Sequence, residues 1–527
     1  MSARSLPDQA TLRFLRLEAK RFLKAAQAAD HPRGKAGGAL KLAEAQHLLA
    51  REYGFANWAA LKLRVAELAF ARAGEAEQRV ALIDAICAWG WDHDDASGED
   101  ADHAAPDLAE AMLATAPPAL VAGDFVLACV TGDIDAVRAA LAVDPARARQ
   151  ASGPRGWEPL LYVSYSVLAK TGLPRAGRVV EVAQLLLATG GDPNAHYAAA
   201  AQPDHTFPAL YAAIAVVDNL ALARALLEAG ANPNDTQSLY HAAERWDTDA
   251  LDLLVAHHVS VANLSYCLLH KIDFNHAAGI AWFLNHGADP NARHPKAGET
   301  ALHWAIKRAA RPAIIDMLLA HGADPDARTL AGVTAFPEVR AWTPLDLALR
   351  LGRGDIVAAL RARGATATPP TTEDAFVRAC ARGDAAAAKA QLASDPGLLA
   401  RLAASDRPLA VYLAQQDQGA AAALAVELGF DPQIRGWMDA TALHWAACRG
   451  NAGLARALCE RGVAQLDVGG YFRTPLHAAL YRHWSIGEAD YVGVLEALVA
   501  AGAVLPAKLA PTDDPALDAA VARLRGS

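Results

Sequence analysis

Two short phrases return along this chain, and their spacing constrains the fold more than any other feature. Thr-Ala-Leu-His-Trp-Ala occurs at 300–305 and again at 441–446, and Thr-Pro-Leu-His-Ala-Ala occurs at 474–479. Gly-Ala-Asp-Pro-Asn occurs at 287–291, with close variants at 230–234 and 322–326. Recurrence at intervals of about 33 to 42 residues indicates one supersecondary unit that is stacked many times. Such a chain presents a long surface on which a partner can lie.

The residues of these phrases predict a pair of helices in each unit. Thr474 supplies an oxygen that caps a helix, and Pro475 stands at the first helical position, where a missing N–H costs nothing. Leu476 and Ala479 then face the core, while the two ring nitrogens of His477 can bridge backbone groups of neighbouring units. A second helix, a Gly stop and an outward turn follow. We therefore expect the recurring histidines to be structural and not catalytic.

This pattern resembles the ankyrin repeat over roughly three quarters of the chain. The resemblance implies an all-α fold: an ankyrin-type α-solenoid of about eleven helix pairs with short β-turn or hairpin fingers, preceded by a small helical N-terminal domain. The phrases at 42–58, 153–162 and 232–244 are similar to those of a subfamily of bacterial ankyrin-repeat proteins without an assigned activity. The resemblance implies an interaction protein. The first helices of the units are expected near Asp124, Glu158, Pro208, Gln237, Leu264, Thr300, Thr343, Asp374, Arg407, Thr441 and Thr474.

Charge and composition divide the chain into four expected segments. Residues 1–68 form a basic helical head, 69–118 a helix followed by an acidic linker, 119–506 the solenoid, and 507–527 a C-terminal capping helix. Residues 1–65 carry 12 Lys and Arg against 5 Asp and Glu, whereas the whole chain has a net charge of −9. A basic head on an acidic body raises nucleic acid or an acidic protein as a partner.

Composition excludes several other classes of protein. A hydrophobic fraction of 53% with 20% charged residues describes a chain that buries a large core and is not disordered. The six cysteines form no Cys-x-x-Cys pair, so they do not indicate a disulfide framework. The N-terminus lacks the apolar segment of a signal peptide, and no apolar stretch is long enough to span a membrane. We expect a cytoplasmic protein without a membrane partner.

The sequence carries no motif that indicates an enzyme. Phosphate-binding GxxxxGK[ST], zinc-binding HExxH and the nucleophile elbow GxSxG are all missing. We therefore expect no catalysis, no cofactor and no metal. Two alternatives remain: an active site that assembles only in three dimensions, and a metal held by His93 and His103 in the acidic segment 92–107. Their spacing matches no familiar metal site and favours a solvated acidic loop.

Trp, Tyr and Arg at expected inner-face or finger positions form the candidate partner-binding surface. These three residue types dominate binding hot spots, because each buries a large area and keeps a directional polar group. The alternative is that some of them fill gaps between uneven units. The candidate residues are Arg155, Trp157, Tyr165, Arg245, Trp246, Arg308, Trp342, Trp437, Arg449, Tyr471, Arg473, Tyr481, Arg482 and Trp484, together with the neighbouring aromatic residue Phe472.

A second hypothesis places function in the head. The segment 50–55, Ala-Arg-Glu-Tyr-Gly-Phe, resembles the centre of a helix-turn-helix, within a candidate nucleic-acid-binding region at 40–66. Lys62 and Arg64 on the following helix would face phosphates or bases, and the basic charge would attract them. Trp58 and Leu61 on the same helix are expected to be buried, which favours a helical domain that packs on the solenoid instead. The solenoid would then be a sensor or partner module.

Overall fold

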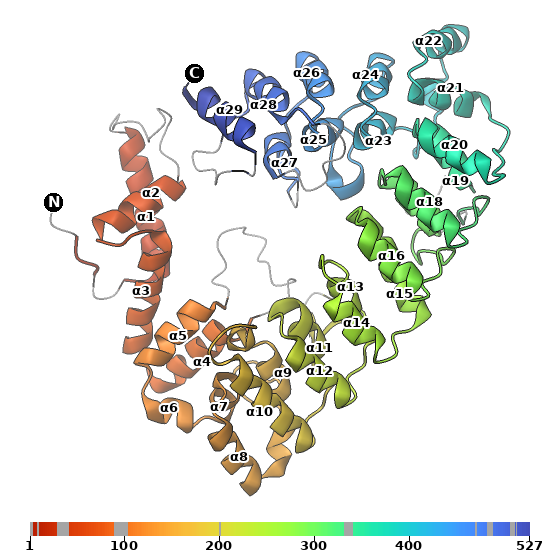
Figure 1. Ribbon diagram of the computed structural model, residues 1–527. Helices are drawn as coiled ribbons and strands as arrows, with labels where there is room; N and C mark the ends of the chain where they lie inside the picture. Colours follow the sequence, from red (N-terminus) through yellow and green to blue (C-terminus); the bar gives the residue numbers. More distant parts are fainter. Residues whose placement is uncertain are drawn as a thin grey trace. The chain divides into compact units, whose positions relative to one another are not determined.

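The computed structural model describes residues 4–7, 10–28, 42–88, 104–199, 202–330, 341–469, 472–481, 489–505, 512 and 514–526. The described chain is mostly helical (Figure 1). It forms two compact units, the first running to Asn263 and the second beginning at Leu264. In the described part, no helix is long and apolar enough to cross a membrane.

The first unit begins with three helices, α1 (Leu12–Ala28), α2 (Leu42–Glu52) and α3 (Trp58–Arg72). They share a core in which Leu15, Leu49 and Leu61 are fully buried. Gly54 takes the left-handed conformation after α2, with φ of +83°. The Asn57 side chain caps α3 by accepting a hydrogen bond at 2.9 Å from the backbone N–H of Ala60, the third residue of the helix. Then come α4 (Glu75–Ile86), α5 (Pro106–Thr115) and α6 (Pro118–Ala122).

Helix pairs make up the rest of the first unit. They are α7 (Phe125–Thr131) with α8 (Ile134–Val143), α9 (Pro159–Ser164) with α10 (Ala176–Ala188), α11 (Ala209–Tyr211) with α12 (Leu220–Glu228), and α13 (Ser238–Ala242) with α14 (Asp249–Val255). Between α10 and α11 an antiparallel hairpin of β1 (His196–Ala199) and β2 (Gln202–Pro208) takes the place of a finger. Its register sets Tyr197 opposite Phe207.

The second unit continues in the same way and ends in a single helix. Its pairs are α15 (Val261–Asp273) with α16 (Ala277–Asn285), α17 (Ala301–Lys307) with α18 (Pro312–Ala320), α19 (Pro344–Arg350) with α20 (Gly354–Ala362), α21 (Thr372–Ala381) with α22 (Ala385–Ser394), α23 (Leu409–Gln415) with α24 (Gly419–Glu427), α25 (Ala442–Cys448) with α26 (Ala452–Glu460), and α27 (Pro475–Tyr481) with α28 (Tyr491–Ala500). The chain closes with α29 (Pro515–Gly526), whose first turn is capped by the Asp514 carboxylate.

Buried histidines join neighbouring helix pairs, as the sequence predicted. His303 Nδ1 lies 2.9 Å from Thr300 Oγ1, and Nε2 lies 3.0 Å from the carbonyl oxygen of Trp342 in the next unit. His444 makes the same pair of contacts, with Thr441 Oγ1 at 2.8 Å and a carbonyl oxygen in the following unit at 3.0 Å. Since a carbonyl oxygen only accepts, Nε2 carries the proton in both rings.

Asp346 takes the histidine position in α19 and links neighbouring helix pairs with a carboxylate instead of an imidazole. Its carboxylate accepts hydrogen bonds from the backbone N–H of Thr368 at 2.9 Å and from the guanidinium of Arg378 at 3.0 Å. It also completes a capping box with Thr343 at the start of its own helix. Histidine and aspartate at this repeat position therefore both link one helix pair to the next through a buried polar side chain.

Cysteines with matching sequence contexts lie in the core. Cys129 and Cys380 are fully buried, and burial raises the pKa of both thiols, that of Cys380 to about 12. A thiol that stays protonated at neutral pH is a poor nucleophile. These two cysteines are therefore small core residues.

Side chains from α23 contact α17, although two helix pairs lie between them in sequence. The Gln416 amide donates to the Ile306 carbonyl oxygen at 2.9 Å, and the Gln415 amide donates to the Lys307 carbonyl oxygen at 3.1 Å. Packed helices lie about 8–10 Å apart, so three regular steps would separate these helices by about 25–30 Å. The stack in the second unit therefore turns sharply, at the corner occupied by α21 and α22 in Figure 1.

Candidate binding site

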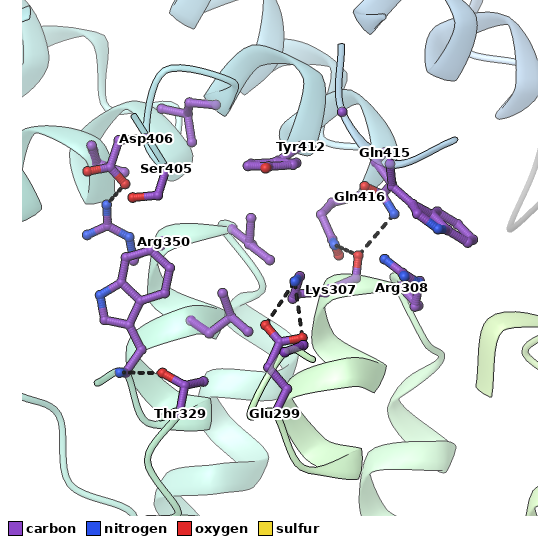
Figure 2. Close-up of a pocket in the computed structure, with 18 of the residues that line it drawn as sticks. Glu299, Lys307, Arg308, Thr329, Arg350, Ser405, Asp406, Tyr412, Gln415 and Gln416 are labelled. Atoms are coloured by element: carbon purple, nitrogen blue, oxygen red, sulfur yellow. Dashed lines mark hydrogen bonds and ion pairs between the residues drawn. The ribbon is translucent and has the colours of Figure 1, made fainter. Parts of the chain in front are cut away.

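The turn in the second unit encloses a cavity of about 340 Å³. Its lining comes from α17, α19, α21 and α23, from the segment before α23, and from the fingers before α17, α19 and α25. Figure 2 shows Ser405, Asp406 and Arg350 on one side of the space and Lys307 with Glu299 on the other. We call the lining residues Glu299, Lys307, Arg308, Trp342, Tyr412 and Trp437 the cavity face.

An ion pair with a buried carboxylate and a half-buried lysine lies at one side of the cavity. Lys307 Nζ contacts the two carboxylate oxygens of Glu299 at 2.8 and 3.1 Å, and the Glu299 side chain is buried. The Tyr412 ring lines the same space; burial and the neighbouring Glu299 charge raise the pKa of its hydroxyl, while Arg308 opposes this. The hydroxyl therefore stays protonated at neutral pH and keeps its ability to donate.

Arg308 lies between two indole rings. Its guanidinium carbon is 3.8 Å from the ring centroid of Trp437 and 4.5 Å from that of Trp304, and its Nε donates to Asp273 at 2.6 Å. Burial raises the pKa of Asp273, but hydrogen bonds and the charges of His270 and Arg308 hold it below its ordinary value. A cation held between two rings and a carboxylate fixes the position of Trp437 at the edge of the cavity.

The finger that carries Trp437 is strained. The two residues after it, Met438 and Asp439, both take left-handed conformations, with φ of +57° and +59°. A residue with a Cβ atom loses about 1–2 kcal/mol in this conformation, so two in succession need support from their surroundings. Trp437 also stacks on Trp445, with 5.7 Å between the ring centroids. Strain of this kind gathers at functional loops, which supports a role for this finger in binding.

The opposite side of the cavity is built around Arg350. Its guanidinium donates to Asp374 at 2.6 Å and to Asp406, and it lies 4.5 Å from the ring centroid of Trp342. Next to Asp406, the Ser405 hydroxyl oxygen is buried, and no hydrogen-bond partner for it exists among the residues that the structure describes. The cavity thus combines paired charges, aromatic rings and one buried hydroxyl without a partner.

Three of the candidate partner-binding residues, Arg308, Trp342 and Trp437, meet at this cavity. Those of the first unit lie elsewhere. Arg155 donates to the carbonyl oxygens of Cys87 and Ala88 at 2.7 and 3.0 Å, beneath the surface. Trp157 and Tyr165 are buried against Tyr197 of the hairpin, whose ring centroid lies 4.9 Å from that of Trp157 and 5.5 Å from that of Tyr165. The Trp157 and Tyr165 centroids are 5.4 Å apart. These three side chains fill space between uneven units, the alternative that the sequence left open.

The remaining candidates differ in exposure. Arg245 is ion-paired with Asp218 and Asp247, whereas Trp246 is 71% exposed, in the first unit. Arg449 and Phe472 are buried beside Trp445. Arg473 is exposed. Tyr481 ends α27, while Tyr471, Arg482 and Trp484 lie outside the described residues.

The segment before α23 and the end of that helix supply residues that the sequence did not suggest, namely Ser405, Asp406, Tyr412, Gln415 and Gln416. One signal was available. The turn after α25 reads Arg-Gly-Asn at 449–451, and the corresponding turn after α23 reads Gln-Asp-Gln at 416–418. At this turn Gln415 and Gln416 end the helix, and Asp417 replaces the glycine. Asp417 still takes the left-handed conformation, with φ of +58°.

The helix-turn-helix hypothesis gains no support from the head. Trp58, Leu61 and Val65 of α3 pack in the head core, and Arg64 is ion-paired with Glu67 at 2.9 Å. Nucleic-acid binding stays an untested prediction. Among the described residues, no group of three or more His, Cys, Asp or Glu side chains is arranged to hold a metal ion. His93 and His103 lie outside the described residues.

Stacked helix pairs, outward turns and buried side chains that link successive pairs define a helical repeat protein. A family model of three ankyrin repeats matches residues 239–329 and 268–370, and a model of a single ankyrin repeat matches 438–470. Ankyrin repeats are therefore present at 239–370 and 438–470, as the sequence predicted. Ankyrin repeats typically mediate protein–protein interactions and are usually non-catalytic. A search of curated proteins found no match.

Proposed function

We propose that this chain is a scaffold that holds a protein partner on the cavity face of its second unit, without turnover. The observation that carries the proposal is the meeting of Arg308, Trp342 and Trp437 at one cavity with partly exposed aromatic rings. Aromatic and arginine side chains that are already fixed in place lose little entropy on binding, so they contribute strongly to affinity.

In this proposal all eleven helix pairs from α7 to α28 belong to ankyrin-type units, including those outside the matched residues. The contacts of His303, His444 and Asp346 support it, because each joins its own helix pair to the next one. The helices α1 to α3 form a packing domain ahead of the array. The helix α29 covers the last apolar face, as Leu517 and Val521 are buried in the same core as α28.

The test compares capture of proteins from a lysate of the source cells by the full chain and by variants. Trp437→Ala and Trp342→Ala should each lose a protein that the unaltered chain captures. Trp282→Ala is the matched control, because this indole is only half-buried on the outer helix α16 and does not line the cavity. A partner that is retained by both cavity variants, or lost equally from the control, would contradict the proposed placement.

Trp246→Ala provides a further arm of the same experiment. Its side chain is the most exposed tryptophan among those with described burial, and it belongs to the first unit. If only this variant loses the partner, the binding surface lies on the first unit and the cavity face has another role.

A further inference from the structure

We infer that the cavity of the second unit binds an aromatic ring that carries one neutral hydrogen-bonding group, such as a phenol. This inference is separate from the proposed function, since a ring can enter the cavity whether it belongs to a protein side chain or to a free small molecule. It rests on the size of the cavity, the nature of its walls, the pairing of its charges and the unpartnered Ser405 hydroxyl.

The size and walls of the cavity suit a ring. A volume of about 340 Å³ is at the lower end of the range of about 300–1,000 Å³ that small-molecule sites occupy. Trp342, Tyr412 and Trp437 supply aromatic surface, and Leu347 and Leu409 supply aliphatic surface. Aromatic rings pack favourably on one another in stacked or edge-on arrangements, beyond the effect of the buried area.

Most of the charged side chains that line the cavity already have a partner of opposite charge. Lys307 is paired with Glu299, Arg308 with Asp273, Arg350 with Asp374 and Asp406, and Arg435 with Asp439. Lys296 also lines the cavity, and its exposed side chain has no ion pair among the described residues. A charged group placed against the Arg308 or Arg350 pairs would have to displace a partner, and breaking a buried pair is costly. A neutral ring leaves all the pairs intact.

The Ser405 hydroxyl supplies the polar contact. Its residue is only 7% exposed, and its oxygen has no hydrogen-bond partner among the described residues. A buried polar group without a partner is unfavourable, and most such groups in native proteins have an identifiable partner or role. A hydroxyl or N–H on the ligand would satisfy it, while an unsubstituted ring would leave it unpaired. The site should therefore bind a ring that carries a hydroxyl or N–H more tightly than an unsubstituted ring.

The test measures binding of p-cresol and of toluene to the full-length chain by titration followed with ligand-observed NMR. The unaltered chain should bind both, and p-cresol should be favoured. In Ser405→Ala the ratio of the two affinities should fall by about two- to tenfold, the effect of one net hydrogen bond. An unchanged ratio in a variant with the same thermal stability would overturn the role of Ser405, as would the lack of any p-cresol binding to the unaltered chain.

Blocking the cavity provides the second variant. Ala297 is half-buried and lines the cavity, so Ala297→Phe should abolish binding of both probes. Ala320→Phe is the control, because Ala320 is exposed at the end of α18 and away from the lining. If binding persists in Ala297→Phe, or is lost equally in Ala320→Phe, the rings bind elsewhere and the inference is wrong.

Two further probes distinguish the source of the ring. N-acetyltyrosinamide carries the same phenol on a peptide backbone, and N-acetylphenylalaninamide lacks the hydroxyl. Binding of N-acetyltyrosinamide with the same dependence on Ser405 supports a partner side chain. Binding of p-cresol alone supports a free small molecule. Ring binding without any captured protein would refute the proposed scaffold and leave this inference standing.

Discussion

Replacing His303 with alanine should change how the stability of the second unit responds to pH. Burial lowers the pKa of this imidazole to about 4, although the Trp342 carbonyl and the Glu299 charge oppose the shift. In the unfolded chain the same ring has a pKa of about 6.5. The folded ring therefore stays neutral over a range in which the unfolded ring binds a proton.

The sign and magnitude follow from these two values. The contribution of His303 to stability is complete above pH 6.5 and is lost as the pH falls toward 4, because protons then bind the unfolded chain preferentially. The full loss is about 3 kcal/mol, and about 2 kcal/mol of it occurs by pH 5. At pH 7, His303→Ala should cost about 2–4 kcal/mol through lost hydrogen bonds and a new cavity.

The pH dependence of the His303 contribution should appear as a change with pH in the stability cost of His303→Ala. The unaltered chain is destabilised by acid through this ring and the variant is not, so the cost of His303→Ala should shrink by about 2 kcal/mol between pH 7 and pH 5. A repeat array need not unfold in a single step, so the suitable measurement is local. Amide hydrogen exchange of peptides from α17, corrected for the intrinsic exchange rate, gives the free energy of opening at each pH.

Peptides from α8 in the first unit serve as the internal control and should not respond to the variant. The reasoning would be refuted if the cost of His303→Ala at α17 were the same at pH 5 as at pH 7. That result would mean that the folded ring accepts a proton as readily as the unfolded one, in spite of its burial and its contact with a carbonyl oxygen.

Three further predictions concern single side chains. Gly352→Ala should lower the melting temperature more than Gly364→Ala: both glycines have positive φ, but only at Gly352 would a Cβ lie 2.2 Å from a backbone oxygen of α21. Asn57→Ala removes the cap of α3 and should cost the head about 1 kcal/mol, measured by hydrogen exchange of that helix; unchanged exchange would contradict the cap. In the native chain a maleimide should modify half-buried Cys459 before fully buried Cys129, as mass spectrometry of the digested protein would reveal; the opposite order would contradict the burial of Cys129.

Local features of the fold could be predicted from the sequence because short segments encode them. A capping Thr, a Pro at the first helical position and a Gly stop act within a few residues, so the helix starts at Thr300, Thr441 and Thr474 follow directly from the phrases. The bridging by His303 and His444 could also be predicted, because it depends only on the contact between one unit and the next.

The candidate site was only partly predictable. The sequence placed Arg308, Trp342 and Trp437 on one face, but it placed Trp157 and Tyr165 there as well. The structure buries the latter two against the hairpin residue Tyr197. A periodic pattern indicates which face a side chain occupies, whereas only the packing of a particular insertion decides whether that side chain is covered.

The sequence by itself determined that this is a stack of helix pairs with capped helices and linking histidines. The tertiary structure decided that the second unit turns sharply, since the Gln415 and Gln416 amides reach the carbonyl oxygens that end α17. Those bonds join residues more than a hundred positions apart, and no repeat period encodes them. They satisfy polar groups that only the folded chain brings together, and the cavity that contains Ser405 and Tyr412 exists because of that turn.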